Sequence, residues 1–67
     1  MRSDDIIKLV KAGYIIIRQI DKPRLRIETA VFKDGKIRWE LFREYPDSET
    51  LNEDLNCYLK SNKIILD

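Results

Sequence analysis

The shortness of the chain sets the strongest limit on its fold. Its 67 residues can build one small hydrophobic core, which buries about 60% of the surface that the unfolded chain exposes. A pocket for a small molecule needs about 300 Å³ and would take up most of such a core. We therefore expect a single domain over residues 1–67, with no small-molecule substrate and with its function on the surface.

Two residue counts restrict the chemistry that the chain can perform. It contains no histidine and a single cysteine, Cys57. Histidine is the commonest general base, and His and Cys together form the usual zinc sites. One cysteine cannot form an internal disulfide, whereas small secreted domains usually carry several. We expect no enzymatic activity, no cofactor, no metal and a cytoplasmic location.

The N-terminal segment has the pattern of a short helix. Its apolar positions are interrupted by two lysines, which is atypical of a signal peptide or a membrane span. Ser3 can serve as the N-cap, two aspartates follow in the first turn, and Gly13 provides a left-handed stop. We expect this helix to need docking partners, because about ten residues form a marginal helix in isolation.

Three segments in the middle of the chain have the composition of β-strands. Residues 14–20, 24–32 and 36–45 are rich in β-branched and aromatic side chains. Turn signals separate them at Asp21-Lys22-Pro23 and at Lys33-Asp34-Gly35. The second and third segments therefore predict a β-hairpin.

The C-terminal third predicts a second helix. Asp47 or Ser48 can cap it, and apolar side chains follow at helical spacing up to about Lys60. Residues 64–66 are apolar and offer a short terminal strand as an alternative to a loop. The predicted fold is α+β, in the order αβββα(β). It has a small antiparallel sheet of three or four strands and helices on one face.

The register of the hairpin decides which side chains face solvent. A two-residue turn at Asp34-Gly35 would pair Phe32 with Ile37 and mix apolar and charged side chains on both faces. A three-residue loop at 33–35 would pair Val31 with Ile37, Thr29 with Trp39 and Ile27 with Leu41. It would gather the large aliphatic side chains, together with Trp39, on the core face. Because a slip of one residue exchanges the faces, several side chains, each worth about 1.5–3 kcal/mol, favour the three-residue loop.

This register predicts a basic and aromatic face directed away from the helices. Its candidate interaction residues are Arg24, Arg26, Phe32, Arg38 and Phe42. Residues 18–43 carry eight bases and four acids, whereas residues 44–67 carry six acids and two bases. The net charge of +1 is therefore the sum of a basic middle segment and an acidic C-terminal segment. Basic faces with aromatic side chains are typical of proteins that bind single-stranded nucleic acids. The simpler interpretation is an ordinary solvated face, because Arg24 would lie opposite Glu44 and the diagonals would bring Arg26 near Glu40 and Glu28 near Arg38.

The same register sets Glu28 directly opposite Glu40, the one carboxylate pair that it creates. The neighbouring Arg38 and Arg26 would stabilise both charges, so we expect no catalytic dyad there.

The first predicted strand is apolar on both faces, since Ile15 and Ile17 point opposite to Ile16. A strand at the edge of a one-sided sheet should instead alternate with polar residues. In the simpler interpretation, residues 64–66 pair beside this strand, and the helices or the tail cover both sides. In the alternative, one row of isoleucines is exposed for a homodimer or another partner.

A resemblance adds an expectation about origin. Residues 11–18 (KAGYIIIR), residues 39–42 and the acidic capped helix ending near residues 64–67 resemble small uncharacterised bacterial proteins of prophages and conjugative elements. The resemblance implies a mobile-element protein and transfers no activity. The element order is also similar to that of small phage inhibitors of defence nucleases, which are commonly strongly acidic, unlike this chain.

These observations predict a small non-enzymatic module for protein–protein interaction. The partner would be another protein or a second copy, bound through the sheet face, an exposed strand edge or the acidic helix. The alternative is a weak nucleic-acid binder that uses Arg24, Arg26, Phe32, Arg38 and Phe42. Salt separates the two, because phosphate contacts weaken steeply with salt whereas an apolar interface does not.

Overall fold

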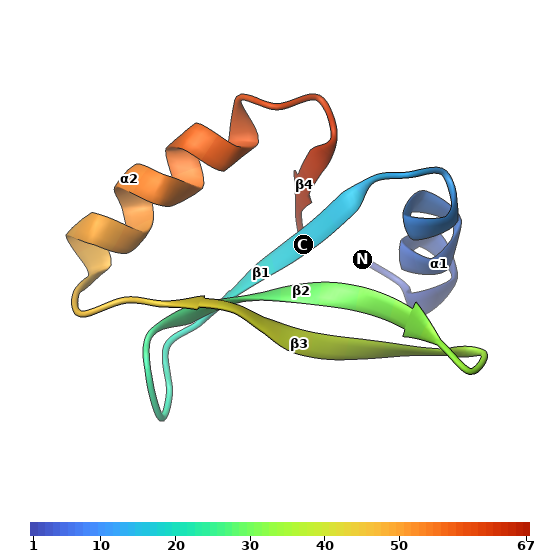
Figure 1. Ribbon diagram of the computed structural model, residues 1–67, viewed down its shortest axis with the longest axis horizontal. Helices are drawn as coiled ribbons and strands as arrows, with labels where there is room; N and C mark the ends of the chain where they lie inside the picture. Colours follow the sequence, from blue (N-terminus) through green and yellow to red (C-terminus); the bar gives the residue numbers. More distant parts are fainter.

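The computed structural model describes residues 1–67 and contains two helices and four strands (Figure 1). In chain order they are α1 (Ser3–Lys11), β1 (Ile15–Ile20), β2 (Arg26–Lys33), β3 (Lys36–Glu44), α2 (Ser48–Leu59) and β4 (Ile64–Leu66). The predicted α+β class and element order are confirmed, and the C-terminal residues do form a fourth strand.

The four strands form one mixed sheet in the order β3-β2-β1-β4. The pairs β1–β2 and β2–β3 are antiparallel, as the sequence predicts, whereas β4 runs parallel to β1. A strand that returns through a helical crossover lies parallel to the strand that precedes the helix. Because α2 carries the chain from the β3 edge to the opposite edge, β4 has the direction of both β3 and β1.

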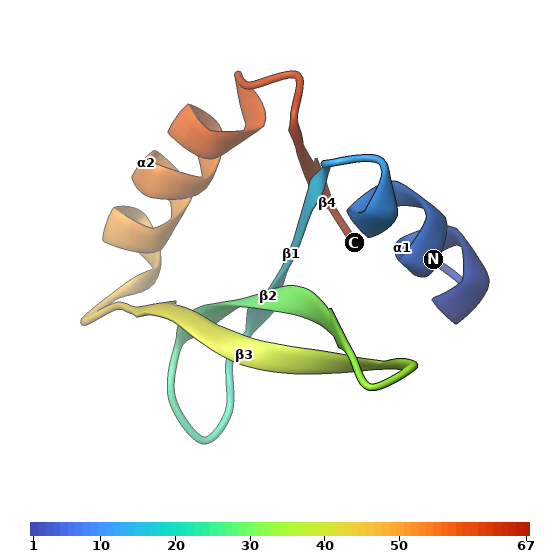
Figure 2. The ribbon, with the colours of Figure 1, turned by 45° about the vertical axis from the view of Figure 1, so that its right-hand side comes forward.

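The two helices lie on opposite faces of the sheet, which corrects the expectation that they share one face. Ile16 and Ile17 are neighbours in β1, and both are fully buried. Ile16 packs with Ile6 of α1, and Ile17 packs with Leu51 of α2. Figure 2 shows β1 and β4 between the two helices. A strand that is apolar on both faces needs a cover on each, and the apolar stripe of one helix covers only one.

The hairpin has a two-residue turn, so the predicted three-residue loop is wrong. Asp34 and Gly35 both have positive φ, 53° and 76°, as a turn between two directly paired strands requires. Phe32 lies opposite Ile37 in the resulting register. The three-residue loop would bury more aliphatic side chains only if one face of the sheet were covered and the other faced solvent. Because a helix covers each face, apolar side chains can be buried on both faces of the hairpin. The two-residue turn is then favoured, because its backbone matches the twist of the strands.

A β-bulge in β3 shifts the register near its C-terminal end. Ile27 lies opposite Arg43, and Phe42 has no partner on β2. The ring of Phe42 contacts Tyr58 of α2 edge-on, with 5.3 Å between the ring centroids. Arg43 binds Asp54 of α2 at 2.9 Å. The bulge therefore directs two consecutive side chains of β3 to the α2 side of the sheet.

Three of the four helix ends agree with the sequence, and one of these is the end of α2 at Leu59. Gly13 has a φ of 97° just after α1, and Asp47 caps α2 by accepting the backbone N–H of Thr50 at 2.8 Å. This bond lowers the pKa of the Asp47 carboxyl below its ordinary value. At the start of α1, however, Arg2 occupies the N-cap position without a side-chain bond, and Ser3 is the first helical residue.

Candidate functional site

The surface offers clusters of side chains rather than a cavity. It holds no pocket, and no three side chains of the metal-ligating types come together. Neither helix has the length and apolar character needed to cross a membrane. The single cysteine, Cys57, is an exposed free thiol. The clusters described below lie on the two sheet faces and along the outer edge of β3.

The five predicted interaction residues do not share one face. Arg26 and Phe32 lie on the α1 side, where the Nζ atom of Lys11 sits 4.9 Å from the centroid of the Phe32 ring. Arg38 and Phe42 lie on the α2 side, and Arg24 belongs to the loop before β2. The division follows from the two-residue turn, because a slip of one residue exchanges the faces of a strand.

Two of the three predicted arginines are engaged in ion pairs. Arg24 lies 3.7 Å from Glu44, as the sequence predicts, and Arg26 binds Glu28 at 2.9 Å. The predicted pairing of Arg26 with Glu40 is wrong, because the corrected register sets Glu40 on the other face. Arg38 has no acidic partner and is the one predicted arginine whose charge is not paired.

Glu28 organises a cluster on the α1 side that the sequence did not predict. Its carboxylate accepts bonds from Nη2 of Arg18 at 2.7 Å and from Nε of Arg26 at 2.9 Å. The Arg18 guanidinium also lies 4.1 Å from the ring centroid of Trp39. Arg18 was detectable as the one charged residue in the middle of an apolar strand. Its partners, however, depend on the register between β1, β2 and β3.

Trp39 occupies a different environment from the one predicted. The sequence placed it at the centre of the core opposite Thr29, but it lies opposite Ala30 and is half-buried beneath Arg18. The predicted carboxylate pair of Glu28 and Glu40 does not form, because these residues lie on opposite faces. The Glu28 cluster is thus a network of charge-assisted bonds that joins two strands and covers one face of the indole ring.

We predict that this network makes folding sensitive to acid. The bonds from Arg18 and Arg26 hold the pKa of Glu28 below its ordinary value of 4.5. A carboxyl group whose pKa is lowered by folding stabilises the fold above its unfolded pKa, and this contribution is lost as the pH falls through the folded pKa. Urea unfolding measured between pH 6 and pH 2.5 should therefore show a weaker loss of stability in Glu28→Gln than in wild type.

The control for this experiment is Glu53→Gln, because Glu53 is exposed on α2 and forms no ion pair. Its acid dependence should match that of wild type. Carboxyl titration by NMR should also show the pKa of Glu28 rising in Arg18→Gln. An unchanged acid dependence in Glu28→Gln would contradict the stabilising role of the cluster.

A second network fastens α2 to the end of β3. Asp54 accepts bonds from the Tyr45 hydroxyl and from Nη1 of Arg43, both at 2.9 Å. Burial and the bond to Asp54 raise the pKa of the Tyr45 phenol above its ordinary value. The Asp54 network joins the C-terminal end of the edge strand to the middle of α2.

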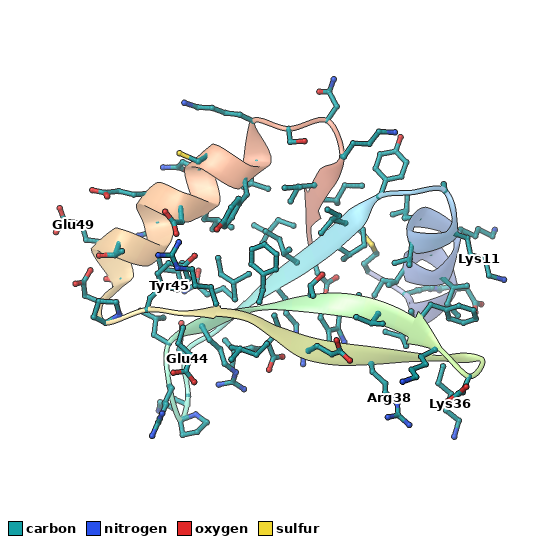
Figure 3. The ribbon with its side chains drawn as sticks, in the orientation of Figure 1. Lys11, Lys36, Arg38, Glu44, Tyr45 and Glu49 are labelled. Atoms are coloured by element: carbon teal, nitrogen blue, oxygen red, sulfur yellow. The ribbon has the colours of Figure 1, made fainter.

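β3 forms one open edge of the sheet, since only β2 pairs with it. We call residues 36–42, which end with the bulge at Phe42, the edge segment. Leu41 in this segment is 58% exposed, and the adjacent Phe42 is 42% exposed. Figure 3 shows Lys36 and Arg38 near one end of β3 and Glu44 at the other. The edge therefore combines unpaired backbone, exposed apolar side chains and charges of opposite sign at its two ends.

Comparison with known protein families, with characterised proteins and with solved structures found no match to this chain. The origin in a mobile element stays a prediction from the sequence.

Proposed function

We propose that this protein is a small non-enzymatic interaction module that binds an extended segment of a partner protein along the edge segment of β3. The observation that carries the proposal is the exposure of Leu41. This side chain is 58% exposed and lies in a strand whose outer backbone has no partner. A free strand edge provides main-chain hydrogen bonds to an added strand, and its alternate side chains provide specificity.

The composition of the edge segment supports a specific partner. Charged side chains at Lys36, Arg38 and Glu40 and the bulge at Phe42 are features that discourage indiscriminate pairing of strand edges. Leu41 and the half-buried Ile37 and Trp39 lie together on the α1 side, where a strand with apolar side chains in register would cover them. The edge is therefore selective for a partner strand that is apolar on one face and charged on the other.

Nucleic-acid binding is less well supported. Arg24 and Arg26 are held in ion pairs, and the aromatic rings of Phe32 and Phe42 lie on opposite faces. Within the hairpin, Arg38, Lys33 and Lys36 are the cations without an ion-pair partner that remain for phosphate groups. A salt-sensitive complex that depends on these cations is the outcome that would favour this alternative.

Photo-crosslinking tests the proposal. A photoreactive amino acid is placed at Leu41, and a matched control carries it at Lys60, which is exposed just after α2. The C-terminal end of α2 lies away from β3 (Figure 1). In extracts of the producing cells, we expect protein adducts from position 41 that survive nuclease treatment and high salt. We expect none of the same adducts from position 60.

Three results would count against protein binding at the edge. These are an absence of adducts at position 41, equal adducts at both positions, and adducts that disappear after nuclease treatment. The last result would point to nucleic acid. Adducts between two copies of the chain would identify the protein itself as the partner.

A further inference from the structure

The edge segment is complementary to itself. We propose that two copies of the chain pair their β3 strands in antiparallel fashion about a two-fold axis at Trp39, so that one sheet runs through both copies. This inference rests on the proposed function, because it assigns a partner to the same edge. It follows from three properties of the segment: its backbone, its charges and its apolar side chains.

The direction of the backbone groups restricts the possible registers. Lys33 and Lys36 flank the two-residue turn and lie opposite each other, so they exchange backbone bonds across the hairpin. Since the bonding direction alternates along a strand, Ile37, Trp39 and Leu41 direct their N–H and C=O groups away from β2. An added strand forms bonds only where outward-directed residues of both strands meet.

A two-fold axis at Trp39 satisfies this condition. It places Trp39 opposite Trp39 of the second copy and Ile37 opposite Leu41 of the second copy. All outward-directed residues of the edge segment then meet outward-directed residues. The pairing ends at Phe42, where the bulge interrupts the regular strand.

The charges select this axis over its neighbours. With the axis at Trp39, Arg38 lies opposite Glu40 of the second copy, and symmetry forms this pair twice. Both side chains are exposed and have no acidic or basic partner within one copy. Moving the axis to Arg38 would set two arginines opposite each other, and moving it to Glu40 would set two glutamates opposite each other. Like charges directly opposite destabilise a strand pair.

The apolar side chains and the two ends of β3 also favour the register with the axis at Trp39. Leu41, which is 58% exposed in one copy, gains Ile37 of the second copy as a cross-strand neighbour. The antiparallel arrangement also brings the end of β3 that carries Lys36 beside the end that carries Glu44 in the second copy (Figure 3).

Charge reversal tests the pairing by sedimentation velocity. Arg38→Glu and Glu40→Arg each create two like-charged pairs across the axis, so each variant should dissociate at least about tenfold more readily than wild type, a change of about 1.4 kcal/mol. An equimolar mixture should form heterodimers, because every glutamate then faces an arginine. The double variant Arg38→Glu/Glu40→Arg should regain the self-association of wild type.

Charge reversals outside the edge segment serve as matched controls for the change in self-association. Lys60→Glu and Glu53→Arg reverse the same charges at exposed positions of α2 or its end and should dimerise as wild type does. Circular dichroism establishes that each variant is folded. The fluorescence of the single tryptophan should change with protein concentration in wild type and in the equimolar mixture, and not in either single variant alone.

Two results would overturn the proposed dimer. One is a wild-type protein that stays monomeric up to about 1 mM, which would mean a dimer dissociation constant above that concentration. The other is a dimer that tolerates both single reversals, which would use a different surface. Either result leaves protein binding at the edge to be decided separately by crosslinking from Leu41, where an adduct to another protein would identify a different partner.

Discussion

Replacing either Ile16 or Ile17 by alanine should lower the free energy of unfolding by about 2–5 kcal/mol, although the two residues are neighbours in one strand. Both side chains are fully buried, one against α1 and the other against α2. A protein of this length has a total stability of about 3–10 kcal/mol. Each substitution therefore removes a large fraction of the free energy that maintains the fold.

Urea unfolding monitored by circular dichroism measures this effect. Ile15→Ala is the matched control, because Ile15 lies in the same strand but is 42% exposed, and its loss should be markedly smaller. If either of the two inner substitutions proved as mild as the control, then the sheet would not be covered on both faces. A sheet with helices on one face would give one severe and one mild substitution.

Leu51→Ala should also cost about 2–5 kcal/mol, because Leu51 is the one fully buried side chain of α2. Its effect should depend on Ile17, which belongs to the same cluster, and not on Ile16, which lies on the other face. Residues packed together show coupling energies of about 0.5–3 kcal/mol, whereas separate sites add within about 0.5 kcal/mol.

Double-mutant cycles distinguish these cases. The cycles combine Leu51→Ala with Ile17→Val and with Ile16→Val, since the loss of one methyl group from each isoleucine keeps the double variants folded. Equal coupling of Leu51 to both isoleucines would mean that the two clusters act as one core. Coupling to Ile17 alone would show that each helix stabilises its own face of the sheet.

Local patterns in the sequence predicted the elements and their order. The β-branched runs, the turn residues and the helical spacing of apolar side chains each reflect interactions within a few residues. Gly13 after α1 and Asp47 before α2 were identified for the same reason, because helix ends are determined by neighbouring backbone groups. These features do not depend on how the elements later pack.

The candidate site was less predictable, because it depends on the hairpin register. The expected face of Arg24, Arg26, Phe32, Arg38 and Phe42 came from the assumption that one side of the sheet is buried. The Asp34-Gly35 turn and the bulge at Phe42 divide these residues between two faces. Leu41, expected among the buried aliphatic side chains, is instead exposed at the edge, and its exposure supports the proposed interface.

The sequence by itself determined the α+β class and the element order, and it showed that the first strand is apolar on both faces, since Ile15, Ile16 and Ile17 leave neither face polar. The tertiary structure alone decided which helix covers which face, which register the hairpin adopts and which strand edge stays open. The physical reason is the range of the interactions. Propensities and caps act between neighbours in the chain, whereas register and coverage minimise the free energy of the whole sheet at once.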